Sequence, residues 1–185
     1  MKKVLKTLKN IVLIALAVVV GLVIIAYLAL LGKGGQYYND DGSYKKVDAG
    51  CSFNYIMNHP GLEGLGEEVL PLGSDLLRTV CGPWRLKIMI PFLGKHEQTV
   101  VDGLNYAIEA AENGRSQFIS YYDDAAKAAE PAKADTGLLF YKTAEGAPFV
   151  VVAPGGGFTM LGVASSAYPY AQPLQEAGYN VFVLE

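Results

Sequence analysis

Histidine and cysteine, the residues that most often hold metals and redox centres, are nearly missing from this sequence. The 185 residues include two cysteines and two histidines. A structural zinc site needs such residues in closely spaced pairs, whereas Cys51, His59, Cys81 and His96 are scattered. The sequence therefore predicts no metal site and no cofactor. Cys51 and Cys81 are either one disulfide, if they lie in an oxidising compartment, or two buried thiols.

Charged residues are also few, at 18% of the chain against about 25% in a typical soluble domain. Much of the shortage lies in the uncharged apolar run from Ile11 to Leu31. As a helix that rises about 1.5 Å per residue, this run is roughly 30 Å long, which matches the hydrocarbon core of a bilayer. Four lysines and no acidic residue precede it. The positive-inside bias therefore places the amino terminus in the cytoplasm and the rest of the chain outside.

We therefore expect residues 1–10 to be a basic cytoplasmic segment and residues 11–32 to be a transmembrane anchor in contact with the lipid bilayer. The chain would then be a single-pass protein of the cell membrane. A cleaved signal peptide is the alternative, because Gly32 to Gly35 offers small residues after the run. The apolar region of a signal peptide is usually shorter, at about 7–15 residues. Both interpretations export the remainder, and cleavage would release it as a secreted protein.

The exported part is acidic. The first ten residues hold 4 of the 15 basic residues, which leaves 15 − 4 = 11 basic against 18 acidic residues and a net charge of −7. Because nucleic acid is itself strongly negative, we expect no nucleic-acid partner.

Residues 33–135 are expected to be an exported tether, over residues 33–50, followed by a helical and irregular region. One amphipathic helix is predicted over Thr99–Asn113, and Gly114 supplies its left-handed end. A short helix and a connector are predicted within residues 123–135. The apolar stripe that predicts the long helix consists of Val101, Leu104, Ile108 and Ala111.

Residues 136–185 have the pattern of an α/β fold. Strands are predicted over residues 137–142, 148–153 and 180–184, with a helix that begins at Ser165 or Ser166 and ends at Glu176. The middle strand is a continuous apolar run, which is typical of a strand buried on both faces. The last two strands flank the helix, so we expect them to be parallel with a right-handed crossover.

A proline and three glycines, Pro154-Gly155-Gly156-Gly157, follow the middle strand directly. A dinucleotide-binding loop is excluded because the third glycine of G-x-G-x-x-G is missing, and a P-loop because no Gly-Lys-Ser/Thr follows. Two interpretations remain for the glycines. They form a tight turn, or they form an oxyanion loop whose backbone N–H groups face a ligand.

The segment from residue 136 onward resembles the start of the α/β-hydrolase superfamily, in particular its bacterial esterase/lipase-like branch. The resemblance rests on the glycine loop, on a β-hairpin of Leu138–Tyr141 with Pro148–Ala153, and on the helix end Glu176–Asn180 before the last strand. It implies that residues 136–185 are the N-terminal part of a hydrolase domain, with its second strand, third strand, oxyanion loop, first helix and fourth strand. Pro154 stands where the family's HGGG motif has histidine.

The resemblance also implies roles for particular residues. The backbone N–H groups of Gly156 and Gly157 would be the oxyanion donors, Phe158 would touch the substrate, and the substrate would be a small-molecule ester. In the family's sheet the third strand lies between the fourth and a fifth. Without a fifth strand, Phe149–Ala153 would be a bare apolar edge, which favours aggregation.

The sequence lacks the other half of such a catalytic site. No G-x-S-x-G is present, and the nearest string, Gly114–Phe118, follows a helix. Ser165 and Ser166 are expected to start a helix. His59 and His96 precede the hydrolase-like strands, whereas the family's order is Ser, then Asp/Glu, then His, so both are expected to be structural or surface residues. We interpret the chain as the N-terminal part of a longer membrane-anchored hydrolase, inactive alone. The alternative is a non-catalytic membrane-anchored binding or interaction protein.

Overall fold

The structure is a computed structural model, and it describes residues 2–63, 75–88, 90, 97–156 and 162–185. The chain divides into two compact units, Met1–Leu31 and Gly32–Glu185. Each is described separately below.

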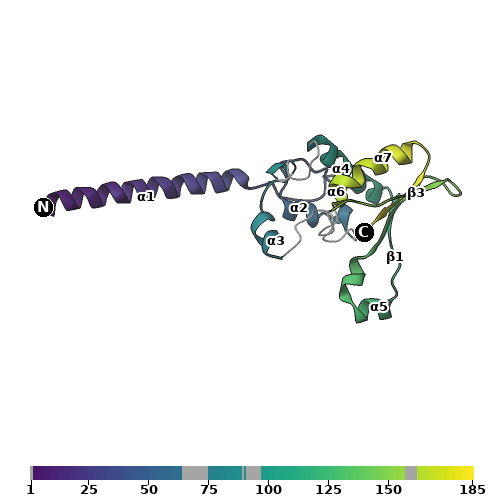
Figure 1. Ribbon diagram of the computed structural model, residues 1–185. Coiled ribbons are helices and arrows are strands. Elements are labelled where there is room, and N and C mark those ends of the chain that lie inside the picture. Colours follow the sequence, from purple (N-terminus) through teal and green to yellow (C-terminus); the bar gives the residue numbers. More distant parts are fainter. Residues whose placement is uncertain (1, 64–74, 89, 91–96, 157–161) are drawn as a thin grey trace. The chain divides into compact units, whose positions relative to one another are not determined.

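The first unit is one helix, α1 (Lys2–Leu30) (Figure 1). Its segment Lys9–Leu30 is long and apolar enough to cross a membrane. Its 22 residues extend over roughly 33 Å, and its large apolar side chains are exposed from Ile11 to Leu28. The predicted apolar helix is therefore confirmed. An N-terminal signal sequence would meet the same criteria.

The second unit is an α/β arrangement of short helices around a four-stranded sheet. The helix predicted over residues 99–113 and the short helix with a connector before residue 136 are both present. The helices are α2 (Phe53–Met57), η1 (Pro60–Leu62), α3 (Asp75–Cys81), η3 (Leu86–Ile88), α4 (Glu97–Glu112), α5 (Asp124–Ala129), η5 (Pro131–Asp135), α6 (Val163–Ser166) and α7 (Tyr168–Glu176). The strands are β1 (Ser116–Ser120), β2 (Gly137–Tyr141), β3 (Phe149–Val152) and β4 (Asn180–Leu184).

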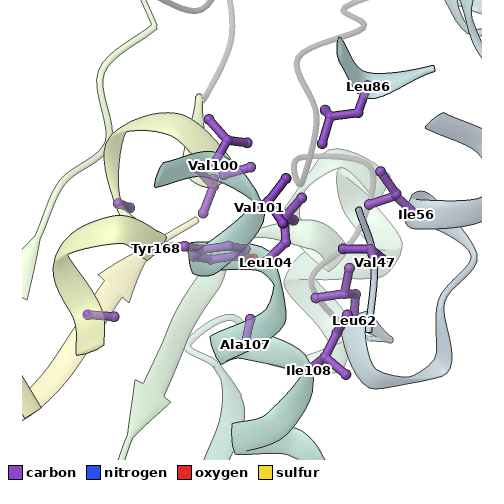
Figure 2. Packing of buried hydrophobic residues seen from close by; sticks show 14 of the residues in the cluster. Val47, Ile56, Leu62, Leu86, Val100, Val101, Leu104, Ala107, Ile108 and Tyr168 are labelled. Carbon is purple, nitrogen blue, oxygen red and sulfur yellow. The ribbon is translucent and has the colours of Figure 1, made fainter. Parts of the chain in front are cut away.

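Helix α4 provides the centre of the core (Figure 2). Its side chains Val100, Leu104 and Ile108 are at most 2% exposed, and the helix packs against α6, α7 and η1. Gly103 allows α7 to come close, because a Cβ there would lie 3.0 Å from the backbone nitrogen of Pro169. The helix ends as the sequence predicts, with Gly114 at φ 62°, a left-handed conformation that glycine adopts without strain.

The sheet has the strand order β1-β2-β4-β3. Strand β2 is antiparallel to both of its neighbours, β1 and β4, whereas β3 and β4 are parallel. The predicted parallel pair is therefore confirmed. The predicted hairpin between β2 and β3 is wrong, because β4 lies between them.

The connection between β2 and β3 is attached to β4 instead of closing a hairpin. The side-chain oxygen of Asn180, the first residue of β4, accepts the N–H of Thr143 at 2.8 Å and that of Ala144 at 3.3 Å. Its amide nitrogen donates to the Ala144 carbonyl at 2.9 Å. Gly146 then turns the chain with φ 73°. These bonds hold the connection at the beginning of β4.

Strand β3 is an edge strand with one open face. Val150 and Val152 pack against the core, but Phe149 is 69% and Val151 is 53% exposed. The prediction of a strand buried on both faces is therefore wrong, because α4, α6 and α7 lie together on one side of the sheet only (Figure 1). Among the described strands β3 pairs only with β4, so the predicted bare apolar edge is present.

Residues 33–50, predicted as a tether, are bound to the folded unit. The N–H of Gly32 donates to the Pro83 carbonyl at 2.9 Å, and the N–H of Lys33 donates to Gly50 at 2.7 Å. The side chain of Asn105 on α4 exchanges two hydrogen bonds, of 2.8 and 2.9 Å, with the backbone of Val47. Residues 33–50 are therefore an ordered part of the folded unit, although their composition is polar.

His59 is a structural histidine, which is one of the two alternatives that the sequence left open. Its ring is buried, and Nδ1 accepts the N–H of Gly61 at 3.0 Å. With Nδ1 as an acceptor, the proton lies on Nε2, which donates to the Lys45 carbonyl at 2.9 Å. The rings of Tyr37 and Tyr44 lie edge-on to the imidazole. Burial lowers the pKa of His59 below its ordinary value, because the charged ring would lose its hydration.

We predict that the open edge makes residues 32–185 aggregate, and that Val151→Lys reduces this aggregation because a charge on an apolar edge blocks strand addition. Light scattering of the isolated unit at micromolar concentration measures the effect. Gln117→Lys, on the already polar edge strand β1, is the control and should change little. A wild-type unit that stays monomeric and unfolds cooperatively would contradict the prediction.

We also predict that stability depends on the charge of His59. Because its folded-state pKa lies below the ordinary value of 6.5, its contribution is complete above about pH 6.5 and is lost as the pH falls toward the folded-state pKa. The loss is at most about 1.4 kcal/mol per pH unit within that window. Urea unfolding of the wild type at a series of pH values measures the loss, and His59→Gln, which cannot be protonated, should lack it. An equal pH dependence in both proteins would refute this role.

Candidate functional site

The glycine loop begins at the carboxyl end of β3, beside the carboxyl end of its parallel neighbour β4. Its first glycine, Gly155, is held by two hydrogen bonds. The N–H of Gly155 donates to Oγ of Ser166 at 3.0 Å, and its carbonyl accepts the N–H of Gly162 at 2.8 Å. The two ends of the loop are thus joined at Gly155 and Gly162.

Ser166, on the short helix α6, makes the bond that fixes the start of the loop. Its hydroxyl donates to the Gly162 carbonyl at 2.7 Å while it accepts from Gly155. The N–H of Gly155 is therefore already engaged and is not an oxyanion donor in this conformation. Sequence reasoning treated Ser166 only as a helix start, because a hydrogen bond to a residue eleven positions earlier leaves no local signal.

Close packing at the base of the loop requires a second glycine. A Cβ on Gly162 would lie 3.1 Å from the Gly155 carbonyl oxygen and 3.1 Å from Oγ of Ser165. Those distances are shorter than ordinary van der Waals contacts, so a larger residue would push the two ends of the loop apart.

Of the residues predicted to act on a substrate, only Gly156 lies within the described part of the chain. It follows Gly155 directly at the carboxyl end of β3. Gly157 and Phe158 lie outside the described residues, as does His96. Gly155, through its hydrogen bonds to Ser166 and Gly162, fixes the start of the loop directly before Gly156.

Two of the three serines considered as nucleophiles, Ser165 and Ser116, also occupy structural positions. Ser165 is 7% exposed and donates to the Gly162 carbonyl at 3.2 Å. Ser116 is the first residue of β1, at the other edge of the sheet from β3. Within the described ranges neither hydroxyl is hydrogen-bonded to a histidine or a carboxylate, so neither has the partner that activates a catalytic serine.

A buried carboxylate, which sequence reasoning missed, lies at the carboxyl end of β4. Glu185 is 5% exposed and accepts a hydrogen bond of 3.2 Å from the hydroxyl of Tyr168 on α7. Burial, and then the charge of Glu185, raise the pKa of Tyr168 well above its ordinary value. Alternation along β4 could have revealed it, because Val181, Val183 and Glu185 share the covered face.

Both cysteines are free thiols with buried side chains, each 6% exposed. The sulfur of Cys51 accepts the N–H of Asp48 at 3.4 Å, and burial raises the pKa of the thiol. A thiol with a raised pKa is mostly protonated at neutral pH and therefore unreactive. In the part of the chain that the structure describes, no group of three or more His, Cys, Asp or Glu side chains is arranged to hold a metal.

No protein-family model matches the chain, and no match was found among curated proteins or solved structures. The glycine loop and the sheet that carries it are therefore the features from which a function can be proposed.

We predict that Ser166→Ala loosens the start of the glycine loop. Loss of one hydrogen bond worth about 1 kcal/mol should speed amide hydrogen exchange of Gly155 roughly fivefold. Two-dimensional NMR of the chain in detergent micelles measures this rate. Ser165→Ala is the matched control, because its hydroxyl does not bond Gly155, and it should leave the rate unchanged. Equal exchange in both variants would show that Ser166 does not hold the loop.

Proposed function

We propose that this chain forms the first half of an α/β-hydrolase-type domain and supplies its oxyanion loop for the hydrolysis of a carboxylic ester. The observation that carries the proposal is the position of the glycine loop. It follows β3 at the carboxyl end of a parallel strand pair, and β3 lies beside β4 at the edge of the sheet. In open α/β sheets ligands bind at the carboxyl ends of the strands.

The arrangement of the strands supports the same proposal. The resemblance predicts that the strand before the oxyanion loop pairs with the strand after the first helix, and β3 and β4 are paired in this way. It also predicts a vacant edge on the far side of β3, where a fifth strand would continue the sheet. Among the described strands, β3 has no partner on that side.

The loop would act through backbone N–H groups that face the negative oxygen of a tetrahedral intermediate. By the resemblance, the proposed donors are Gly156 and Gly157, whereas the N–H of Gly155 donates to Ser166. A donor of this kind typically contributes about 10²–10³ to turnover. Pro154 does not impair this role, because the donors are backbone groups of the glycines. The serine that attacks the acyl carbon, its acid and its histidine would come from polypeptide outside this sequence, which contains no G-x-S-x-G.

We further propose that α1 is an uncleaved anchor with the amino terminus in the cytoplasm. Cleavage after Gly32 would remove its hydrogen bond to Pro83. Cleavage after residue 33, 34 or 35 would also remove the hydrogen bond of Lys33 to Gly50 and its 2.8 Å ion pair with Asp48. Gly32 is also closely packed, since a Cβ there would lie 2.5 Å from Cα of Ser52. The folded unit thus uses residues that a signal peptidase would separate from it.

A non-catalytic membrane-anchored interaction protein is the second candidate. The open sheet face favours it, because Phe140, Phe182 and Phe149 form a continuous aromatic row there, with ring centroids 4.5 and 6.0 Å apart. Exposed apolar surfaces of this kind often bind another protein. A stop codon directly after Glu185 would favour this candidate, whereas an in-frame strand followed by G-x-S-x-G within about 100 codons would favour the hydrolase.

We predict that the purified 185-residue chain does not hydrolyse a chromogenic short-chain ester, and that a polypeptide extended to include the G-x-S-x-G segment does. In the extended protein Gly156→Pro removes one donor N–H and should lower kcat about 10²–10³-fold. Gly155→Ala is the control, because its Cβ meets nothing within 4 Å and its N–H remains.

Two results would overturn this proposal. Hydrolysis by the 185-residue chain that a serine-directed inhibitor abolishes would show that the nucleophile lies within it. Equal kcat in the Gly156→Pro and Gly155→Ala proteins would exclude the oxyanion role. N-terminal sequencing of the protein purified from membranes tests the proposed anchor. Residues 1–32 should still be attached to the protein.

A further inference from the structure

Helix α3 carries an apolar strip that is open to solvent. Leu76 is 72% and Val80 is 48% exposed. Because residues four positions apart lie on the same side of a helix, these two side chains are neighbours, and we call them the α3 strip. Cys81, the last residue of the helix, is buried in the core cluster. The helix is therefore attached to the folded unit at its carboxyl end and presents the strip to its surroundings.

The α3 strip lies close to the first residue of the second unit. The N–H of Gly32 donates to the Pro83 carbonyl at 2.9 Å, and a Cβ on Gly32 would lie 2.9 Å from Cα of Arg85. Val80 precedes Pro83 by three residues, at most about 11 Å between Cα atoms, and Leu76 is about 6 Å farther along the helix. Both residues of the strip are thus within roughly 20 Å of Gly32. Figure 1 shows α3 at the end of the unit where its chain begins.

The chain connection brings Gly32 to a bilayer surface if α1 is the anchor proposed above. The segment long and apolar enough to span a membrane ends at Leu30, and only Leu31 separates it from Gly32. No free tether follows, because the N–H of Lys33 already donates to the Gly50 carbonyl at 2.7 Å. The folded unit therefore begins directly at the membrane. This step rests on the proposed anchor and does not depend on the proposed hydrolase function.

A bilayer close to the α3 strip supplies the apolar partner that the strip lacks. Two aliphatic side chains alone would bind a free vesicle only weakly. A unit already held at the surface by α1 needs no such affinity, because the second contact is intramolecular and has a high effective concentration. Apolar faces of interfacial helices are buried about 5–10 Å deep at the boundary between headgroups and acyl chains.

We propose that α3 is a second membrane contact of this protein, with Leu76 and Val80 inserted into the boundary between headgroups and acyl chains. The partner is the lipid bilayer itself, and no particular headgroup is required because the strip is apolar. Together with the span through α1, this contact limits rotation of the folded unit about Gly32.

Tryptophan quenching by brominated phosphatidylcholine tests the proposal on the full chain in reconstituted vesicles. Trp84 is the single tryptophan, so Trp84→Phe is a background in which Leu76→Trp or Val80→Trp is the only reporter. With bromines placed close to the headgroup, we expect the fluorescence of each reporter to fall at least about twofold. Tyr121→Trp in the same background is the matched control, because Tyr121 is 50% exposed and outside α3, and its fluorescence should not fall.

A charge within the strip gives a second readout. Leu76→Glu in the Val80→Trp protein should reduce quenching at least about twofold, because a carboxylate is unfavourable among acyl chains. Tyr121→Glu should leave the quenching unchanged. Thermal unfolding shows whether each variant is folded. If Trp84→Phe unfolds, Leu76→Cys labelled with bimane serves as the reporter, because Cys51 and Cys81 are buried.

Equal quenching of reporters at positions 76, 80 and 121 would overturn the proposal, as would unchanged quenching in the Leu76→Glu protein. Flotation of the chain with the vesicles tests the anchor separately. A chain that does not float would overturn both the anchor and the α3 contact, whereas a floating chain with unquenched reporters would overturn only the contact. A negative ester-hydrolysis test would leave the result unchanged.

Discussion

The position of the glycine loop depends on the pairing of β4 with β3. Among the described strands β4 is the only neighbour of β3, and it also joins β3 to β2. Val181 and Val183 on β4 are fully buried, so the strand is anchored to the core beneath α7. Asn180 at its beginning also holds the connection that leads into β3. The loop is therefore placed by contacts made mainly on β4 rather than on the strand that carries it.

Local patterns predicted α4, α5 and the strands and helix after residue 136, but they predicted neither α2, α3 and β1 nor the pairing of the strands. Val101, Leu104 and Ile108 lie on one side of a helix, and that periodicity is contained in a few consecutive residues. The partner of a strand depends on residues far away in the sequence. The hairpin expected for β2 and β3 was therefore wrong, and so was the burial expected for β3. An apolar run does not reveal whether a second helical layer is present.

The same limit applies to the candidate site. The sequence located the glycine loop, because proline and glycine directly after an apolar run are a strong local signal. It could not reveal that Ser166 engages Gly155, or that the side chain of Gln175 donates to the Lys142 carbonyl, since those contacts join separate segments. The place of His59 in the chain predicted a structural or surface residue, but it did not reveal the Gly61 and Lys45 groups that fix its proton.

The junction after α1 bears on when this protein can fold. Gly32 and Lys33 are the first residues of the second unit, yet their partners Pro83, Gly50 and Ser52 follow later in the chain. During synthesis Lys33 is made before Gly50 and Ser52, and Gly32 is made well before Pro83. The hydrogen bond that holds Gly32 can therefore form only after more than fifty further residues have been added. The beginning of the second unit is thus made first but is one of the last parts to become ordered.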